Sequence, residues 1–137
     1  MHIRLFLPWP PSINAYYMQS RAHTRGKPSP KILSGAARKY HEKLEIAIHE
    51  QIPEITLEPL SDKLRLVSIL HPPDRRIRDI DNYVKPMLDS LTRSNVWEDD
   101  KLVDQHENYR GVVTKFGMVR LAITLAGPIL PADYWPD

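Results

Sequence analysis

Arginines and aspartates alternate at unusual density in residues 74–81, near the middle of the chain. This charged stretch contains three aspartates and three arginines: Asp74, Arg75, Arg76, Arg78, Asp79 and Asp81. Carboxylates held close together repel each other and raise each other's pKa, and a divalent cation removes that conflict. Mg²⁺ is typically bound by one or two carboxylates with waters and substrate phosphates, and nearby arginines attract the phosphate. The pattern therefore predicts a metal-assisted site that acts on a phosphodiester.

The flanking sequence predicts the elements that position this stretch. Residues 64–70 are rich in β-forming side chains and end before two prolines, which indicates a strand. Apolar residues then recur at helical spacing over residues 84–91, with Asp81 as the expected N-cap. Lys85 lies about one turn into this helix. Pro86 indicates either a kink or a helix that begins nearer Lys85, because proline removes a backbone hydrogen bond.

The order of strand, charged loop and helix start also favours the binding of an anion. Backbone N–H groups at a helix N-terminus lack partners within the helix and attract negative charge. A second acidic segment, Trp97 to Asp100, follows the helix. Val96 and Trp97 are expected to enter the core and so to carry Asp99 and Asp100 into the site.

The other predicted elements are a first strand, a long loop, a second helix and two further strands. Residues 1–8 indicate a strand, and the proline clusters of residues 8–30 indicate a long loop, of a kind that is usually functional or disordered. Basic and aromatic side chains in that loop suit a nucleic-acid surface, although Trp9 is expected to pack instead. A helix is predicted for residues 34–52. Strands are predicted for residues 102–111 and 117–125.

Composition limits the class of protein. The chain has 137 residues, 42% of them hydrophobic, with no apolar run long enough for a membrane span, so we expect one soluble domain without a membrane partner. The absence of cysteine fits a reducing cytoplasm and excludes disulfides and thiolate sites. Residues 1–43 carry eight Lys or Arg against one acid, whereas residues 44–137 carry eleven against sixteen. A basic half beside an acidic half suits a polyanion and bound cations.

Several separated motifs occur in the order found in a known family. They are Pro-Trp-Pro-Pro-Ser-x-Asn at 8–14, Pro-Asp-Arg-Arg-x-Arg-Asp-x-Asp-Asn at 73–82, Lys85, Asp89-x-Leu-Thr at 89–92 and Trp-x-Asp-Asp at 97–100. Together they resemble the RusA-type Holliday junction resolvases over roughly residues 3–125. We therefore expect an α/β (α+β) fold, with a small mixed sheet packed against two main helices in residues 1–126 and a proline-rich tail at 127–137.

The resemblance implies a homodimeric endonuclease, dependent on Mg²⁺ or Mn²⁺, that cuts paired strands of four-way junction DNA in recombination and repair and is often encoded by prophages. It implies that Asp79, Asp81 and Asp100 are essential and bind the metal, and that Lys85 orients the water or neutralises developing charge. Arg75, Arg76 and Arg78 would hold phosphates. Further DNA contacts are expected from Arg21, Arg25, Lys27 and Asn14.

Two alternatives stay open on the sequence. A restriction-type nuclease would use Asp74, Asp99 and Lys101 in a Pro-Asp…(Asp/Glu)-x-Lys pattern. A junction-binding protein that does not cut would use the metal only for structure. An EF-hand is excluded because its glycine and terminal glutamate are missing at the required positions. His41, Glu45 and His49 share a helix face but lack the His-Glu-x-x-His motif, so we expect a solvated surface.

Overall fold

The computed structural model describes residues 1–20, 25–27 and 30–137, and the site is built around its four-stranded sheet. The sheet has the order β1-β6-β4-β5, formed by β1 (His2–Leu7), β6 (Met118–Leu125), β4 (Leu64–His71) and β5 (Val103–Arg110). Strands β4 and β5 are parallel, while β6 runs antiparallel to both β1 and β4. The mixed α+β sheet predicted from the sequence is confirmed, and each predicted strand is present.

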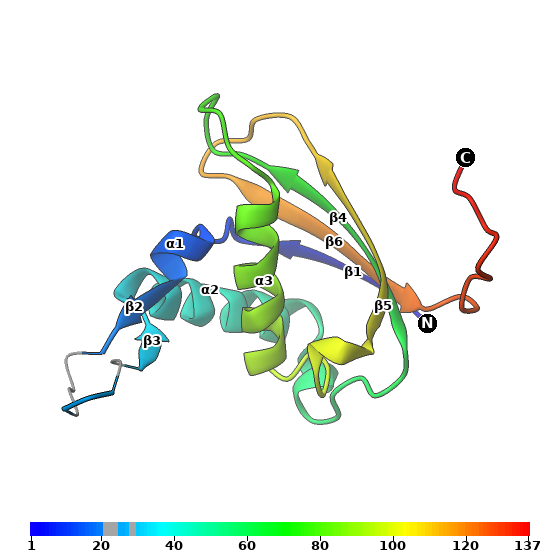
Figure 1. Ribbon diagram of the computed structural model, residues 1–137, viewed down its shortest axis with the longest axis horizontal. Helices are drawn as coiled ribbons and strands as arrows, with labels where there is room; N and C mark the ends of the chain where they lie inside the picture. Colours follow the sequence, from blue (N-terminus) through cyan, green and yellow to red (C-terminus); the bar gives the residue numbers. More distant parts are fainter. Residues whose placement is uncertain (21–24, 28–29) are drawn as a thin grey trace.

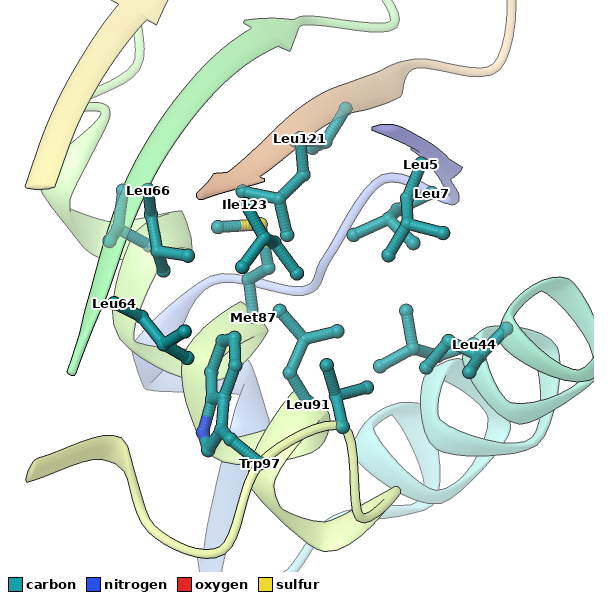
Figure 2. Packing of buried hydrophobic residues seen from close by; sticks show 14 of the residues in the cluster. Leu5, Leu7, Leu44, Leu64, Leu66, Met87, Leu91, Trp97, Leu121 and Ile123 are labelled. Atoms are coloured by element: carbon teal, nitrogen blue, oxygen red, sulfur yellow. The ribbon is translucent and has the colours of Figure 1, made fainter. Parts of the chain in front are cut away.

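Two helices cover one face of this sheet (Figure 1). They are α2 (Gly35–Gln51) and α3 (Asp81–Arg93). In β1, β4 and β6, side chains alternate between core and surface, so every second residue of each strand meets the helices. Figure 2 shows Leu66, Leu121 and Ile123 of the sheet facing Met87 and Leu91 of α3, all nearly fully buried. Burial of each such side chain stabilises the fold by about 1.5–3 kcal/mol.

Helix α2 begins where the sequence predicts. The Ser34 hydroxyl oxygen accepts the N–H of Ala37 at 3.0 Å, which satisfies one unpaired amide of the first turn. One face of this helix is buried, including Leu44 and Ile48. On the solvent side, His41 Nε2 lies 3.1 Å from Glu45 Oε1. This surface pair agrees with the solvated face expected from the sequence.

Helix α3 begins one residue earlier than predicted. Ile80 occupies the N-cap without a side-chain bond, so the expected N-cap role of Asp81 is wrong. Instead, the Asp79 carboxylate oxygen Oδ1 accepts the N–H of Asp81 at 3.1 Å. Pro86 lies inside the helix and is buried, so the alternative of a helix that begins nearer Lys85 is also wrong. Pro86 has no N–H to donate to the helix, and its ring is buried.

Two short elements lie within the segment predicted to be one long loop, residues 8–30, and a third follows directly after it. They are α1 (Ile13–Tyr16) and an antiparallel ribbon of β2 (Tyr17–Gln19) and β3 (Lys31–Leu33). Elements of three or four residues carry too little periodicity to be read from sequence. Tyr16 is completely buried, and its hydroxyl lies 2.9 Å from that of Ser90 on α3. The start of this segment is therefore anchored to the helix that carries the site.

The two remaining aromatic features agree with prediction. Trp9 packs against the core, with its ring centroid 4.9 Å from that of Tyr83, so its predicted packing role is confirmed. Val96 and Trp97 are fully buried, and the Trp97 indole N–H donates to the Thr92 hydroxyl at 2.7 Å. This anchoring fixes the chain immediately before Asp99.

Beyond β6, residues 126–137 form neither helix nor strand and expose most of their side chains. Within the part of the chain that the structure describes, no helix is long and apolar enough to cross a membrane.

Candidate active site

The charged loop, residues 72–80, leaves the carboxyl end of β4 and leads into α3. Asp74 organises it: its carboxylate accepts from Arg78 Nη1 at 2.7 Å and from the Arg76 backbone N–H at 2.9 Å. The Arg78 guanidinium beside it, and then Arg76, hold the pKa of the Asp74 carboxyl far below its usual range. Asp74 therefore stays ionised and acts as an internal brace of the loop.

The three arginines of this loop have different surroundings. Arg75 is exposed, and Arg76 is exposed although its guanidinium bonds to Asp74. The Arg78 side chain is only 9% exposed and also donates to the carbonyl oxygen of Asp74 at 3.2 Å. Arg75 and Arg76 are thus placed to meet a phosphate, whereas Arg78 is turned toward its own loop.

Asp79 and Asp81 lie at the end of the loop and the start of α3, and both are exposed. The unpaired amides of the first helical turn give this position a partial positive charge. Asp79 uses one carboxylate oxygen to hold the backbone of Asp81. The remaining carboxylate oxygens of the pair face an environment that suits both a cation and a phosphate.

An acidic pocket lies further along the same helix. It is lined by seven residues: Tyr17, Lys85, Asp89, Thr92, Arg93, Asp99 and Asp100. Lys85 Nζ lies 3.5 Å from Asp89 Oδ1, one turn away on α3. The Tyr17 hydroxyl donates to Asp89 Oδ2 at 2.5 Å, and burial together with this carboxylate raises the pKa of Tyr17 to about 12. Asp89 is thereby held between a cation and a neutral phenol.

Asp99 and Asp100 enter the pocket from the turn before β5, where a short 3₁₀-helix spans Asp100–Leu102. The Asp99 carboxylate accepts the backbone N–H of Lys101 at 2.9 Å, and this bond lowers the pKa of Asp99. Burial, and then the neighbouring Asp99 carboxylate, raise the pKa of Asp100, against the attraction of Lys85. Crowding of carboxylates, which the sequence analysis expected in the charged stretch at Asp79 and Asp81, is seen here between Asp99 and Asp100.

The structure brings some predicted site residues together and separates others. Lys85 and Asp100 share the acidic pocket, whereas Asp81 precedes Lys85 by one helical turn, about 6 Å along the axis. Asp79 lies before the helix. Across residues 1–20, 25–27 and 30–137, no three acidic or histidine side chains are close enough to hold one ion as they stand.

Four pocket residues were not predicted as site residues: Tyr17, Asp89, Thr92 and Arg93. Asp89 occurs four residues after Lys85, a spacing that places opposite charges together on a helix and could have identified it. Tyr17 carries no such signal, because only the three-dimensional fold brings it to α3. Among the predicted DNA contacts, Asn14, Arg25 and Lys27 are exposed, and Arg21 lies outside the described residues.

The residues of the restriction-type alternative are arranged differently. Asp74 is committed to Arg76 and Arg78, as described above. Lys101 is 86% exposed, and its ammonium lies 4.0 Å from Asp99. Asp99 and Lys101 are neighbours, but no bond described in the structure connects either of them to Asp74.

Comparison with known proteins adds a family assignment. The family model described as Endodeoxyribonuclease RusA matches residues 8–125. Proteins named crossover junction endodeoxyribonuclease RusA from Shigella sonnei (strain Ss046) and Escherichia coli (strain K12) are each 36% identical over 121 residues. A protein of the same name from Enterobacteria phage 82 has the same identity over the same length. Each alignment covers 88% of this chain and 92% of the relative.

Proposed function

The chain belongs to the RusA family of endodeoxyribonucleases, and we propose that it resolves four-way (Holliday) DNA junctions by hydrolysing phosphodiesters on opposing strands. The observation that carries this proposal is the match over nearly the whole chain to nucleases named for the crossover junction. An arginine-rich loop that ends at two aspartates, beside a pocket with Lys85 and Asp100, supports it chemically. The phage relative also supports a prophage origin and a role in DNA recombination. The absence of cysteine supports a cytoplasmic location.

Each side chain of the site has a proposed role. Arg75 and Arg76 bind phosphates of the junction arms, and the first turn of α3 adds its amide dipoles. Lys85 neutralises charge that develops on the phosphate as the new bond to water forms. Asp100 helps to hold the metal, and the neighbouring Asp99 carboxylate, fixed by the backbone N–H of Lys101, supports it from the same turn. Asp89 and Tyr17 hold Lys85 in position.

The carboxylates fit a divalent metal by donor type, because Mg²⁺ and Mn²⁺ prefer oxygen ligands. Asp79, Asp81 and Asp100 would hold it. When bound, the metal supplies a water of lowered pKa and neutralises charge on the phosphate. The crowding of Asp99 and Asp100 is the feature of this chain that a cation would relieve. As the side chains stand, the three aspartates are not gathered within the described residues.

Thermal unfolding tests the metal proposal without any cutting. Adding Mg²⁺ or Mn²⁺ should raise the melting temperature of the purified protein by a few degrees. Each kcal/mol by which bound metal stabilises the folded state shifts the melting temperature of a domain of this size by roughly 2–4 °C or more. Asp100→Asn should reduce this shift, whereas Asp104→Asn, on an exposed position of β5, should keep it. An equal shift in both variants would contradict the assignment of the metal to Asp100.

We also propose a homodimer, because a four-way junction in its open form is nearly two-fold symmetric and two opposing cuts need two sites. The sheet face away from the helices is hollowed, and no helix among the described residues covers it. Its hollow includes Phe6, Val67, Ile69 and Ala122, with Arg4 and Arg120 beside them. Phe6 and Ile69 both pair with Arg120 across the sheet, so these side chains form one row. A second copy would cover this apolar row.

Light scattering on the eluting protein tests the dimer. We expect twice the mass of 15.9 kDa for the unaltered chain and a monomer for Phe6→Glu. Ile46→Glu, at an exposed apolar position of α2, is the matched control and should leave the dimer intact. A dimer that survives Phe6→Glu would place the interface elsewhere.

Two rival assignments predict different variants to be inactive. If the restriction-type site operates, Asp74→Asn and Lys101→Gln abolish cutting, and Asp79→Asn does not. If the protein only binds junctions, no variant changes the rate of cutting, because nothing is cut with any metal.

Cutting assays on a labelled synthetic four-way junction and a linear duplex, each with Mg²⁺ or with chelator, decide the function itself. Paired nicks near the crossover, only in the junction and only with metal, are expected. Equal cutting of duplex, or binding without cutting, would overturn the proposal.

A further inference from the structure

Two loops at one end of the sheet present apolar side chains to solvent. One is the charged loop, and the other is the return loop, residues 111–117, which connects β5 to β6 (Figure 1). Ile77, at the tip of the charged loop, is fully exposed, and Phe116 in the return loop is 82% exposed. Neither side chain contributes to the core. Both are large and apolar in segments that otherwise have many charges.

Direct hydrogen bonds hold the two loops together. The N–H of Thr114 donates to the carbonyl oxygen of Pro72 at 2.9 Å, and Arg110 Nη2 donates to the carbonyl oxygen of Arg78 at 2.7 Å. His71 Nδ1 also lies 2.9 Å from the carbonyl oxygen of Val112. These bonds join the base of one loop to the base of the other. Ile77 and Phe116 therefore project from a common, braced support.

The bases of the loops are tightly packed as well. A Cβ on Gly117 would lie 2.7 Å from the Trp9 Cβ and 3.1 Å from the Pro73 ring. Gly117 adopts φ +70°, and Phe116 before it adopts φ +68°. This backbone conformation suits glycine or asparagine and is unfavourable for a bulky aromatic side chain. An exposed phenylalanine at this position works against folding, which indicates a use outside the folded core.

Both apolar side chains have cations beside them. Arg75 and Arg76 immediately precede Ile77 and are exposed. Lys115 Nζ lies 5.2 Å from the centre of the Phe116 ring. Single exposed apolar residues are common on proteins and need no explanation. Apolar tips flanked by cations on two joined loops, however, match a surface that holds DNA phosphates while apolar groups meet the bases.

We propose that Ile77 and Phe116 form an apolar wedge that unstacks bases at the junction crossover. The proposal rests on the proposed function and adds how the substrate is deformed before it is cut. Ile77 inserts at a base step, as apolar wedges do in proteins that kink DNA, and Phe116 stacks on the exposed base. Because Ile77 precedes Asp79 by two residues, the opened step lies beside the phosphate that the active site receives.

Fluorescence of 2-aminopurine tests the unstacking directly. The probe base is placed next to the cut step of a synthetic four-way junction, and the protein carries Asp100→Asn so that it binds without cutting. We expect bound protein to increase the probe fluorescence about threefold or more, because the base leaves the stack. Adding Ile77→Ser or Phe116→Ser should remove most of this increase while junction binding persists. Adding Ile46→Ser, at an exposed apolar position remote from both loops, should leave it unchanged.

Cutting of a pre-opened substrate separates a wedge from a merely structural role. With Asp100 intact, Ile77→Ser should slow cutting of a fully paired junction about tenfold, since it no longer assists unstacking. A mismatch at the cut step should restore the rate of Ile77→Ser to within about threefold of the unaltered chain. If the unaltered chain leaves junctions uncut, the proposed function itself fails. If it cuts them, while Ile77→Ser and Phe116→Ser cut at the same rate and show the same fluorescence, only the wedge is overturned.

Discussion

The two ends of α3 carry the same kinds of residue in opposite settings. At its start, Asp79 and Asp81 are exposed beside an arginine-rich loop and the helix dipole. In the acidic pocket, Asp99 and Asp100 form a half-buried, hydrogen-bonded pair near Lys85. Exposed carboxylates among cations are suited to bind metal and phosphate, whereas a crowded pair, in which the pKa of Asp100 is raised and that of Asp99 is lowered, is suited to share a cation that relieves the repulsion. The difference indicates one reaction divided between the two ends of a rigid helix.

Charge-neutralising variants at each end should have the largest effect. Asp79→Asn and Asp100→Asn should each slow single-turnover cutting of a four-way junction about 10³-fold, because each removes a group that acts on the reacting phosphate or water. Junction binding should persist or improve in both. Asp104→Asn is the control and should cut normally. If only the pocket variant loses activity, the start of α3 serves for binding alone.

Gly111, at the start of the return loop, should limit which side chains the loop base tolerates and so affect the free energy of unfolding. A Cβ on Gly111 would lie 2.5 Å from the His71 ring, which is buried and hydrogen-bonded to both Val112 and Arg120. Gly111→Ala should therefore lower the free energy of unfolding by about 1–3 kcal/mol through overpacking. Denaturant titration measures this, with Gly35→Ala, which meets no atom within 4 Å, as the control. Equal stability of the two variants would show that the loop end adapts freely.

Two arginines of the charged loop should behave differently, although they are three residues apart. Arg75→Gln should weaken junction binding and reduce the slope of log affinity against log salt by about one, as expected for a lost phosphate contact. Arg78→Gln should instead lower the melting temperature, because Arg78 braces Asp74 and its own loop. Titrations at several salt concentrations check the first effect. A change in slope for Arg78→Gln without loss of stability would reverse the two roles.

The smallest effect concerns His106 on β5, outside both ends of α3. Burial lowers its pKa below the ordinary value of 6.5, although a hydrogen bond with Asn108 opposes this. Below about pH 6.5 the unfolded chain then binds a proton more readily than the folded one, so stability falls as the pH decreases. His106→Gln should flatten this decrease in urea titrations between pH 7 and pH 5. The control His49→Gln, on the exposed side of α2, should leave the decrease in stability unchanged.

The core elements could be predicted from the sequence, and so could Asp100 of the acidic pocket, but Asp89 and the grouping of the pocket residues could not. The β-forming residues of β4 that end at two prolines, the alternation in β6 and the capping Ser34 carry strong local signals, so those elements were found. The position of Tyr17 against Asp89 depends on how α1 and the β2–β3 ribbon pack on α3, which no local pattern encodes. The N-cap of α3 was misassigned because Ile80, which occupies it, is not a typical capping residue, and the Asp79 side chain one position earlier accepts the amide instead. The division at residues 126 and 127 stays a prediction.

The central claim is that the two ends of α3 act in one reaction, and a double variant tests it most directly. Single-turnover cutting of a labelled four-way junction is measured for Asp79→Asn, Asp100→Asn and the two combined. Groups that act as a unit are not additive, so the double variant should cut about as slowly as the slower single variant. If the two losses multiply instead, to about 10⁶-fold from two losses of about 10³-fold, the ends act independently and the account is contradicted.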